Sequence, residues 1–344
     1  MSALVFNCDY NGLGLIHSLG RKGVKVFALD SRRSIGTRSK YSEYINVPGP
    51  LVDVGGFISK LMNFEFDGKP LLLPTNDHWA EAVATHSEML EKKYTICTPN
   101  AESVSLTLDK FRFARWAKQL GIDVPVVWSP EEVRSLVDGD MKYPIAVKAK
   151  GRRSIGQSSS GSLGAKNADR MRFVICNNRD ELLAALRLAD ELKVDSYCQQ
   201  VVNGDSSCMR TIGIYANRGV VKGIFYGRKV RGFPAGFGDC IVGEALPVPV
   251  WARNYAHIIA RELNYTGIAE IEFMEDADSN INYLIELNPR SWSWVGVCAE
   301  SGVDLAWIAY QDLILAADPP LRESCQDGVP VRYVKCLQDF FNVV

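Results

Sequence analysis

The sequence predicts a protein of the α/β and α+β classes, with a small parallel α/β domain at the N-terminus and a larger two-lobed region after it. Strands and helices alternate over the first hundred residues, and beyond them tight turns join neighbouring strands. The length of 344 residues agrees with this division, since a single domain usually has about 100–200 residues. We therefore expect clefts between domains.

The composition is that of a globular protein in water. Hydrophobic residues make up 47% of the chain and charged residues 23%, which excludes a disordered or fibrous chain. Lys and Arg number 39 against 40 Asp and Glu, so the net charge calls for no nucleic-acid partner. The longest apolar stretch, 305–317, contains Gln311 and Asp312 and falls short of the roughly 20 residues of a membrane span. We expect no membrane partner.

The cysteines and the N-terminus indicate the compartment. Nine cysteines, an odd number without a Cys-x-x-Cys pair, argue against a disulfide framework or a zinc site. The N-terminus lacks the basic start and the apolar segment of a signal peptide, because Asp9 comes too early. A cytoplasmic protein with buried thiols is therefore expected, and a homodimer is compatible with this expectation.

Residues 1–100 are expected to form the first domain. Short apolar runs predict strands, and amphipathic stretches between them predict helices. The strands are expected at 3–8, 24–29, 71–73 and 94–97, and the helices at 12–21, 53–63 and 78–92. Because helices separate the strands, the strands should pair in parallel.

Residues 101–318 are expected to form the second domain, with lobes at about 101–200 and 201–318, and residues 319–344 a C-terminal tail. The same patterns predict its elements. Helices are expected at 110–120, 179–192, 251–263 and 304–316, and strands at 143–148, 172–176, 196–202, 267–274 and 281–288. The segment 151–164 is so rich in Gly and Ser that it has no core to join.

Acidic and amide side chains alternate along the two strands 267–274 and 281–288. In a strand every second side chain lies on the same face, and Glu286 and Asn288 therefore share one. If that face coincides with the face of Glu272, two carboxylates and an amide oxygen converge, because paired strands lie about 4.8 Å apart. Such oxygen ligands suit Mg²⁺, which completes its shell with water and phosphate.

A second interpretation of these acids is a polar, solvent-facing side of an edge hairpin. The neighbouring residues favour the metal site. Pro289 fixes a turn after the strand, and Arg290 then carries a guanidinium that matches carboxylate or phosphate oxygens. Lys110 begins a helix, and Lys148 ends a strand just before the Gly/Ser-rich loop, an arrangement suited to binding phosphate.

With these residues the sequence resembles the ATP-grasp superfamily of carboxylate-amine ligases. The matching pieces occur in the family's order over residues 100–318, and the first hundred residues resemble the α/β domain that precedes the ATP-grasp fold. The pieces are Asp109-Lys110, the strand with Lys148, the Gly-rich loop, 199–204, 271–273 and 285–290. Segments 18–23 and 73–77 are similar to the branch that contains D-aspartate ligase.

The resemblance implies an ATP site. Lys110 and Lys148 would contact the phosphates, and the loop with Ser154 and Gly156 would fold over them as a lid. The backbone of the segment Gln199, Gln200, Val201 and Val202 would bind adenine, although the family usually has an acid at position 200. Asp205 would meet the ribose.

The resemblance also implies a reaction centre. Glu272, Glu286 and Asn288 would hold Mg²⁺, with Mn²⁺ as a substitute, and Arg290 would bind the acyl phosphate or its carboxylate. Lys148 would act on the transferring phosphoryl group. Arg228 and Arg231 match basic positions on the substrate side, and solvated turn arginines are the other interpretation of these two.

The implied activity is an ATP-dependent carboxylate-amine ligase that releases ADP and phosphate through an acyl phosphate, with small-molecule carboxylate and amine substrates. Two alternatives stay open on the same fold: an enzyme that forms carboxyphosphate or carbamate, and a nucleotide-binding relative without turnover. A hydride-transfer enzyme is disfavoured, because His17 stands where the third glycine of a dinucleotide-binding loop belongs.

Overall fold

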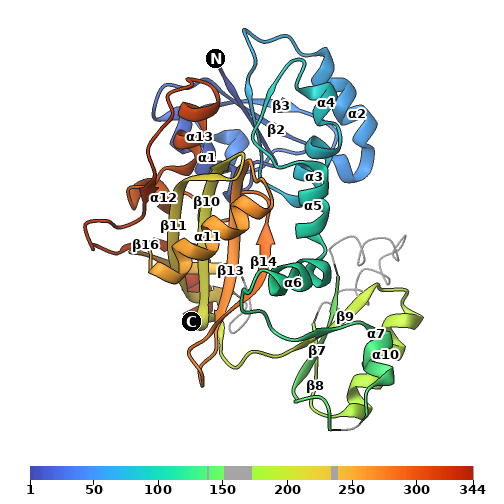
Figure 1. Cartoon of the computed structure of the whole chain (residues 1–344). Coiled ribbons are helices and arrows are strands. Elements are labelled where there is room, and N and C mark those ends of the chain that lie inside the picture. The colour runs from blue at the N-terminus through green and yellow to red at the C-terminus, as the bar shows by residue number, and fades with distance from the viewer. Residues whose placement is uncertain (138, 151–172, 234–238, 344) are drawn as a thin grey trace. The chain divides into compact units, whose positions relative to one another are not determined.

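The computed structural model describes residues 1–137, 139–150, 173–233 and 239–343 (Figure 1). Within these ranges no helix is both long and apolar enough to cross a membrane. The chain divides into two compact units, and it passes between them more than once. The first unit comprises Met1–Ser105, Asp205–Phe273 and Leu287–Val344, and the second comprises Leu106–Gly204 and Met274–Glu286.

The first unit begins with a parallel sheet in the order β3-β2-β1-β4-β5. Its strands pair in register, with Ala3 opposite both Val26 and Leu71. The strands are β1 (Ala3–Phe6), β2 (Val26–Asp30), β3 (Ser42–Asn46), β4 (Leu71–Pro74) and β5 (Thr95–Ile96). The helices around it are α1 (Tyr10–Gly20), α2 (Pro50–Asn63), α3 (Asp77–Thr85) and α4 (Ser87–Leu90), and η1 (Gly36–Arg38) is a short 3₁₀ helix. The sequence pattern did not indicate β3.

Alternation along the strands gives this sheet two apolar faces. Val5 packs in one cluster with residues of α1 and of α13 (Leu305–Leu313), whereas Phe6 packs in another with residues of α2 and α3. Both side chains are completely buried. A parallel sheet covered on both faces needs such continuous apolar strands, which is why the short runs in the sequence predict it.

A larger sheet follows in the order β14-β13-β10-β11-β12-β16, with β15 paired to β11. Its strands are β10 (Met209–Asn217), β11 (Val220–Phe233), β12 (Asp239–Leu246), β13 (Gly267–Glu275), β14 (Asn282–Asn288), β15 (Arg322–Glu323) and β16 (Val331–Val334). Helix α11 (Val250–Glu262) lies along one face (Figure 1). Its Trp251 contacts the rings of Tyr226 and Phe273, which identifies the side chains on that face.

Two indoles cover the opposite face of this sheet. Phe225, which alternates with Tyr226, lies 5.7 Å from Trp292 and 5.3 Å from Trp294 between ring centroids. Both tryptophans are buried, with 2% of their surface exposed. They follow Arg290 in the chain, so this packing fixes the segment that leaves β14. Large aromatic side chains commonly fill a core in this way.

Glycines in the strands make room for these rings. A Cβ atom at Gly213 would lie 2.1 Å from Cη2 of Trp292, far inside contact distance. Because the buried indole can shift only at the cost of its packing contacts, Gly213→Ala is expected to lower the free energy of unfolding by about 1–3 kcal/mol. Urea unfolding measures this change.

The control for this prediction is Gly55→Ala on α2, where the nearest atom would lie 3.8 Å from the new Cβ. That variant should be as stable as the wild type or slightly more stable. Equal unfolding free energies for Gly213→Ala and the wild type would contradict the tight packing of Trp292.

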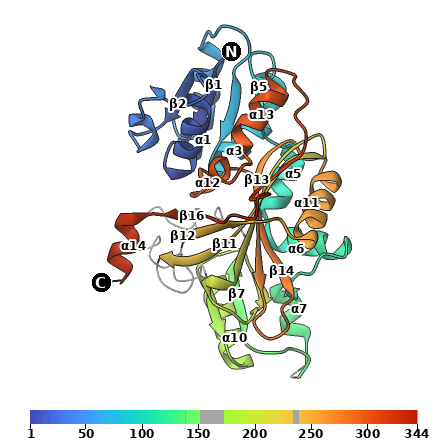
Figure 2. The ribbon, with the colours of Figure 1, turned by 90° about the vertical axis from the view of Figure 1, so that its left-hand side faces the viewer.

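The segment 319–344, which the sequence analysis treats as a tail, adds structure to the first unit. β16 pairs with β12 in the antiparallel sense, with Arg332 opposite Glu244. The short α12 (Val297–Glu300) precedes α13, and α14 (Cys336–Val343) follows β16 at the edge of the sheet (Figure 2). The sheet thus gains an edge strand from this segment.

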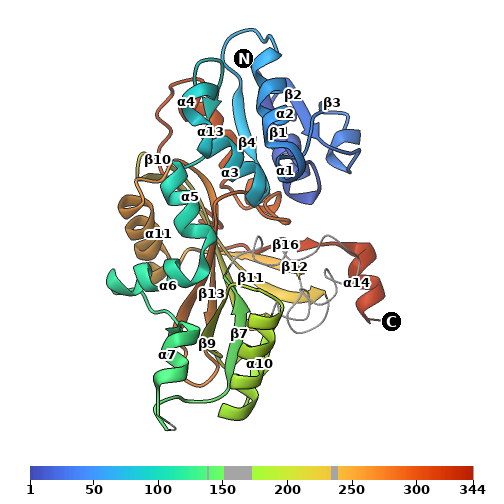
Figure 3. The same ribbon diagram turned by 90° about the vertical axis from the view of Figure 1, so that its right-hand side faces the viewer.

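The second unit contains an antiparallel sheet in the order β6-β9-β7-β8. Its strands are β6 (Val127–Trp128), β7 (Ile145–Ala149), β8 (Val174–Cys176) and β9 (Ser196–Gln200). Its helices are α6 (Lys110–Gln119), α7 (Pro130–Ser135) and α10 (Arg179–Glu191), and α5 (Ala101–Leu108) leads into the unit. Leu182 and Leu186 of α10 pack on Ile145 and Val147 of β7, and α10 lies along the sheet (Figure 3). This sheet carries the predicted phosphate-binding Lys148.

Candidate active site

In the second unit Lys148 is held by β9. Its Nζ donates a hydrogen bond of 3.0 Å to Oε1 of Gln199, and the hydroxyl of Tyr197 donates to the same oxygen over 3.2 Å. Lys148 lies opposite Tyr197 in the register of β7 and β9. Gln199, which the sequence analysis assigned to the adenine segment, therefore orients the ammonium group of Lys148 with its side chain.

Lys110 and Glu286 form an ion pair in the same unit. Asp109 caps α6 by accepting a hydrogen bond of 3.0 Å from the N–H of Arg112, so Lys110 is the first residue of the helix. Burial, with the charges of Glu286 and Asp109, raises the pKa of the Tyr197 hydroxyl, so it stays protonated and can only be a donor to Gln199. Two residues predicted separately, one for phosphate and one for metal, are thus neighbours.

The segment predicted to bind adenine leaves β9 at Gln200. The N–H groups of Gln200 and Val201 donate to the carbonyls of Val126 and Pro144 over 2.9 and 3.1 Å. The N–H of Val202 has no partner among the residues that the structure describes. Of the N–H groups of Gln200, Val201 and Val202, that of Val202 is therefore the one without a partner in the part of the chain that the structure describes.

In the first unit a chain of polar contacts links β13, β14 and α3. Nδ2 of Asn288 donates to Oε2 of Glu270 over 3.1 Å, and NH2 of Arg290 donates to Oδ1 of Asn288 over 2.9 Å. An arginine can only donate, which fixes the orientation of the amide. Because Phe273 faces α11, Glu270 and Glu272 lie on the opposite face of β13.

Arg290 is anchored by a residue that the sequence analysis left out of the site. Its Nε donates over 2.7 Å to Oδ1 of Asp77, at the first position of α3, and NH1 donates over 2.9 Å to the carbonyl of Ser291. Both charged side chains are buried, at 7% exposure each. Such a pair is stable only with good geometry and further hydrogen bonds, which Asn288 and Ser291 supply.

Arg228 and Arg231 have partners elsewhere. Arg228 forms an ion pair of 2.8 Å with Glu244, which Arg332 also contacts. Although burial opposes it, these two guanidinium groups lower the pKa of Glu244. A Cβ at Gly227 would touch Trp294, so Arg228, next in the strand, lies on the other face, away from Trp294. Arg231 donates two bonds, of 2.8 and 2.7 Å, to Asp339 of α14.

The remaining predicted residues have local roles or lie outside the described ranges. Asp205 caps the 3₁₀ helix η2 (Ser206–Cys208), accepting 2.7 and 2.6 Å bonds from the N–H and hydroxyl of Ser207. These bonds lower its pKa. Ser154 and Gly156, with the loop predicted as a lid, lie outside the residues that the structure describes.

Two lysines join the face of Glu270 and were not selected from the sequence. Burial raises the pKa of the Cys240 thiol to about 12, and the charges of Lys229, Glu270, Lys335 and Glu272 act on it as well. The four charged groups come from two strands, β11 and β13, and from the residue after β16. Alternation along β11 could have indicated Lys229, but no sequence pattern around Lys335 predicts its position.

Comparison with solved structures gives the fold. No protein-family model matches the sequence, and no curated protein does. An L-amino acid ligase from Bacillus licheniformis matches with a TM-score of 0.63 at 18% identity, over 93% of this chain and 75% of that one. The N5-carboxyaminoimidazole synthetase of Staphylococcus aureus, complexed with ADP, matches with a TM-score of 0.67 at 15% identity, over 96% and 81%. The chain has the ATP-grasp fold.

A third match agrees. The biotin carboxylase domain dimer of the Hydrogenobacter thermophilus 2-oxoglutarate carboxylase, in complex with MgADP, has a TM-score of 0.65 at 18% identity, over 95% of this chain and 72% of that one. The sequence prediction of a parallel α/β domain followed by an ATP-grasp fold is therefore confirmed. At these identities the likeness concerns the fold, and the ATP-grasp strands β13 and β14 are where the predicted metal ligands lie.

Proposed function

We propose that the protein is an ATP-dependent ligase that joins a small-molecule carboxylate to an amine and releases ADP and phosphate. The observation that carries the proposal is the contact chain from Glu270 through Asn288 and Arg290 to Asp77. Glu286 lies in β14 two residues before Asn288, which belongs to this contact chain. Carboxylates for a cation and a fixed guanidinium for a carboxylate are what phosphorylation of a carboxylate requires.

The residues of the second unit fit a nucleotide. Lys148 is oriented by Gln199, and Lys110 lies at the start of a helix, where positive charge and N–H groups favour phosphate. Val202 offers an N–H suited to adenine. In this proposal the two lysines bind the phosphates of ATP, and Gln199 positions Lys148 by accepting from its ammonium group.

The proposed metal ligands fit Mg²⁺ by their chemistry. Among the described residues no group of three or more His, Cys, Asp or Glu side chains could hold a metal ion. Two carboxylates with the amide oxygen of Asn288 make a smaller set, and Mg²⁺ commonly takes only one or two protein carboxylates. An amide oxygen has two lone pairs, so Oδ1 can accept from Arg290 and also bind a cation. Glu272, Glu286 and Asn288 would hold Mg²⁺, which neutralises phosphate charge.

The chain's own residues then bind and orient the reactants. Arg290, fixed by Asp77 and Ser291, orients the carboxylate whose oxygen attacks the γ-phosphorus of ATP. ADP leaves in this step, and Lys110 and Lys148 stabilise the negative charge that develops on its β-phosphate. The amine attacks the resulting acyl phosphate, so an amide forms and phosphate leaves. No nucleophile from the protein is needed.

A second candidate uses bicarbonate as the carboxylate and forms carboxyphosphate. The matches to a carboxyaminoimidazole synthetase and a biotin carboxylase domain support it, because the fold fits these proteins as well as it fits the amino acid ligase. The two candidates differ in the anion that starts the reaction. ADP release that depends on bicarbonate alone would favour the second.

The experiment is a screen of carboxylates, bicarbonate and amines in pairs, with Mg²⁺ and ATP. ADP release that depends on one carboxylate, with an amide of the expected mass, supports the ligase. AMP and pyrophosphate in place of ADP and phosphate would overturn the acyl phosphate chemistry. ATP binding without turnover on any pair would favour a nucleotide-binding relative.

A further inference from the structure

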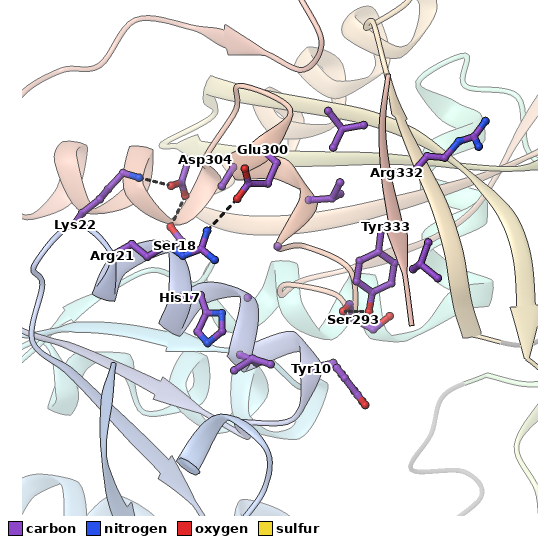
Figure 4. Close-up of a pocket in the computed structure, with 17 residues that line it drawn as sticks. Tyr10, His17, Ser18, Arg21, Lys22, Ser293, Glu300, Asp304, Arg332 and Tyr333 are labelled. Carbon is purple, nitrogen blue, oxygen red and sulfur yellow. Dashed lines mark hydrogen bonds and ion pairs between the residues drawn. The ribbon is translucent and has the colours of Figure 1, made fainter. Parts of the chain in front are cut away.

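A cavity of about 500 Å³ lies within the first unit, along α1 (Figure 4). Helix α1 forms one wall, the segment from Ser293 to Asp304 forms another, and β16 forms the third. Ligand pockets in proteins usually have volumes of about 300–1,000 Å³. The volume is in the range that takes a small organic ligand, such as an amino acid or a dipeptide.

Apolar side chains line part of the cavity, and polar and charged side chains line the rest. Leu13, Val297 and Val331 line it, and the rings of Tyr10 and Tyr333 lie at one end. Burial, with the charges of Arg21 and Lys40, lowers the pKa of His17, so its ring adds a neutral surface at pH 7. An apolar part of a ligand would gain most of its binding energy from these walls.

Ion pairs close one end of the cavity. Arg21 contacts Glu300 at 3.0 Å, and Lys22 contacts Asp304 at 2.9 Å. Ser18 also donates to Asp304. The pairs join α1 to the opposite wall, at the end of the cavity away from Tyr10 and Tyr333 (Figure 4).

Ser293 links the tyrosine end to Arg290 through a short stretch of chain. The hydroxyl of Tyr333 donates to the carbonyl of Ser293 over 3.2 Å, and three residues of chain span about 10 Å at most from Arg290 to Ser293. Nζ of Lys335 lies 4.7 Å from the ring centroid of Tyr10. A positive charge that does not belong to the ion pairs thus stands at this end.

We infer that this cavity binds the organic part of the carboxylate substrate, with the carboxylate at the Tyr10 and Lys335 end. The substrate class is then a carboxylate with an apolar body, of amino-acid to dipeptide size. The inference rests on the proposed function for the identity of the reacting group. The size and polarity inferred for the organic part of the substrate rest on the cavity alone.

Equilibrium binding of two probes tests it. Acetate and 3-phenylpropanoate share the carboxylate and differ in the apolar body. Calorimetric titration of the full chain is expected to show at least tenfold tighter binding of 3-phenylpropanoate. Leu13→Trp and Ala299→Phe fill the cavity from half-buried positions on two walls, and each should remove that preference while leaving acetate unchanged.

Leu51→Trp is the control, because Leu51 is 67% exposed on α2 and outside the cavity. It should keep the wild-type preference. Circular dichroism identifies the variants that fold. Because there are two filling variants, the test still works if one of them does not fold. Equal binding of both probes by the wild type would overturn the inference, as would an unchanged preference in a folded filling variant.

The outcome separates this inference from the proposed function. If the screen finds ligase activity, and both filling variants keep the wild-type selectivity for carboxylates, the cavity inference is wrong and the function stands. If no pair of substrates releases ADP, but binding of 3-phenylpropanoate depends on Leu13 and Ala299, the function is wrong and the cavity is a binding site for carboxylates.

Discussion

Glu286→Gln is expected to lower substrate-dependent phosphate release by about 10³-fold or more. The glutamine keeps the shape of the side chain and removes the charge that would bind Mg²⁺, and loss of one group that stabilises the transition state costs about 10²–10³-fold. Glu286 also forms the ion pair with Lys110, which would bind phosphate, so the substitution affects two charges of the site. The measurement is phosphate release at saturating Mg²⁺ with the substrate pair found in the screen.

The control for Glu286→Gln is Glu43→Gln. Glu43 also forms an ion pair with a lysine, Lys25, but its side chain is 64% exposed at the surface. This variant should turn over at the wild-type rate, since an exposed pair contributes little. Near-normal turnover by Glu286→Gln, in a protein that unfolds at the wild-type temperature, would refute the metal assignment.

Local patterns predict the elements that hold the site. Alternation along β13 and β14 places the acids and the amide on single faces, and the contact of Asn288 with Glu270 shows that those faces coincide. The apolar runs of β1 and β4 predict a parallel sheet because both faces of such a sheet are buried. These features depend on neighbours in sequence, which is why a pattern can reveal them.

Features that depend on distant contacts could not be predicted in the same way. Asp77 lies 213 residues before Arg290, and only the fold makes them partners. The face on which Arg228 lies is determined by Trp294, which packs on Gly227. β16 has only four residues, and its pairing with β12 needs the edge of a formed sheet.

Arg290→Lys is expected to lower kcat/KM for the carboxylate by about 10²-fold or more, with a much smaller effect on the binding of ATP and Mg²⁺. The guanidinium has five N–H groups in a fixed plane, and it donates to Asp77, Asn288 and Ser291 in three directions. A lysine keeps the charge but has one nitrogen, so it cannot keep that plane or present a fork to a carboxylate. Steady-state kinetics and trapping of the acyl phosphate with hydroxylamine measure the loss.

Arg253→Lys is the matched control. Arg253 also contacts a carboxylate through two nitrogens, at 2.5 and 2.7 Å from Glu323, but on α11. It should leave kcat/KM nearly unchanged. If Arg290→Lys has the kinetics of this control, Arg290 takes no part in the reaction.

The dependence on Mg²⁺ then distinguishes two ways in which Arg290 could act. If it binds the substrate, kcat/KM for the carboxylate stays low in Arg290→Lys at every Mg²⁺ concentration. If it acts only by orienting Asn288, the Arg290→Lys variant binds Mg²⁺ more weakly. Excess Mg²⁺ then restores activity, because a higher concentration occupies the weaker site by mass action. Asp77→Asn extends the test, since it removes the charge that holds Nε of Arg290. The same loss of kcat/KM in a folded Asp77→Asn variant, without rescue by Mg²⁺, would make Asp77 the residue that positions Arg290 for the carboxylate.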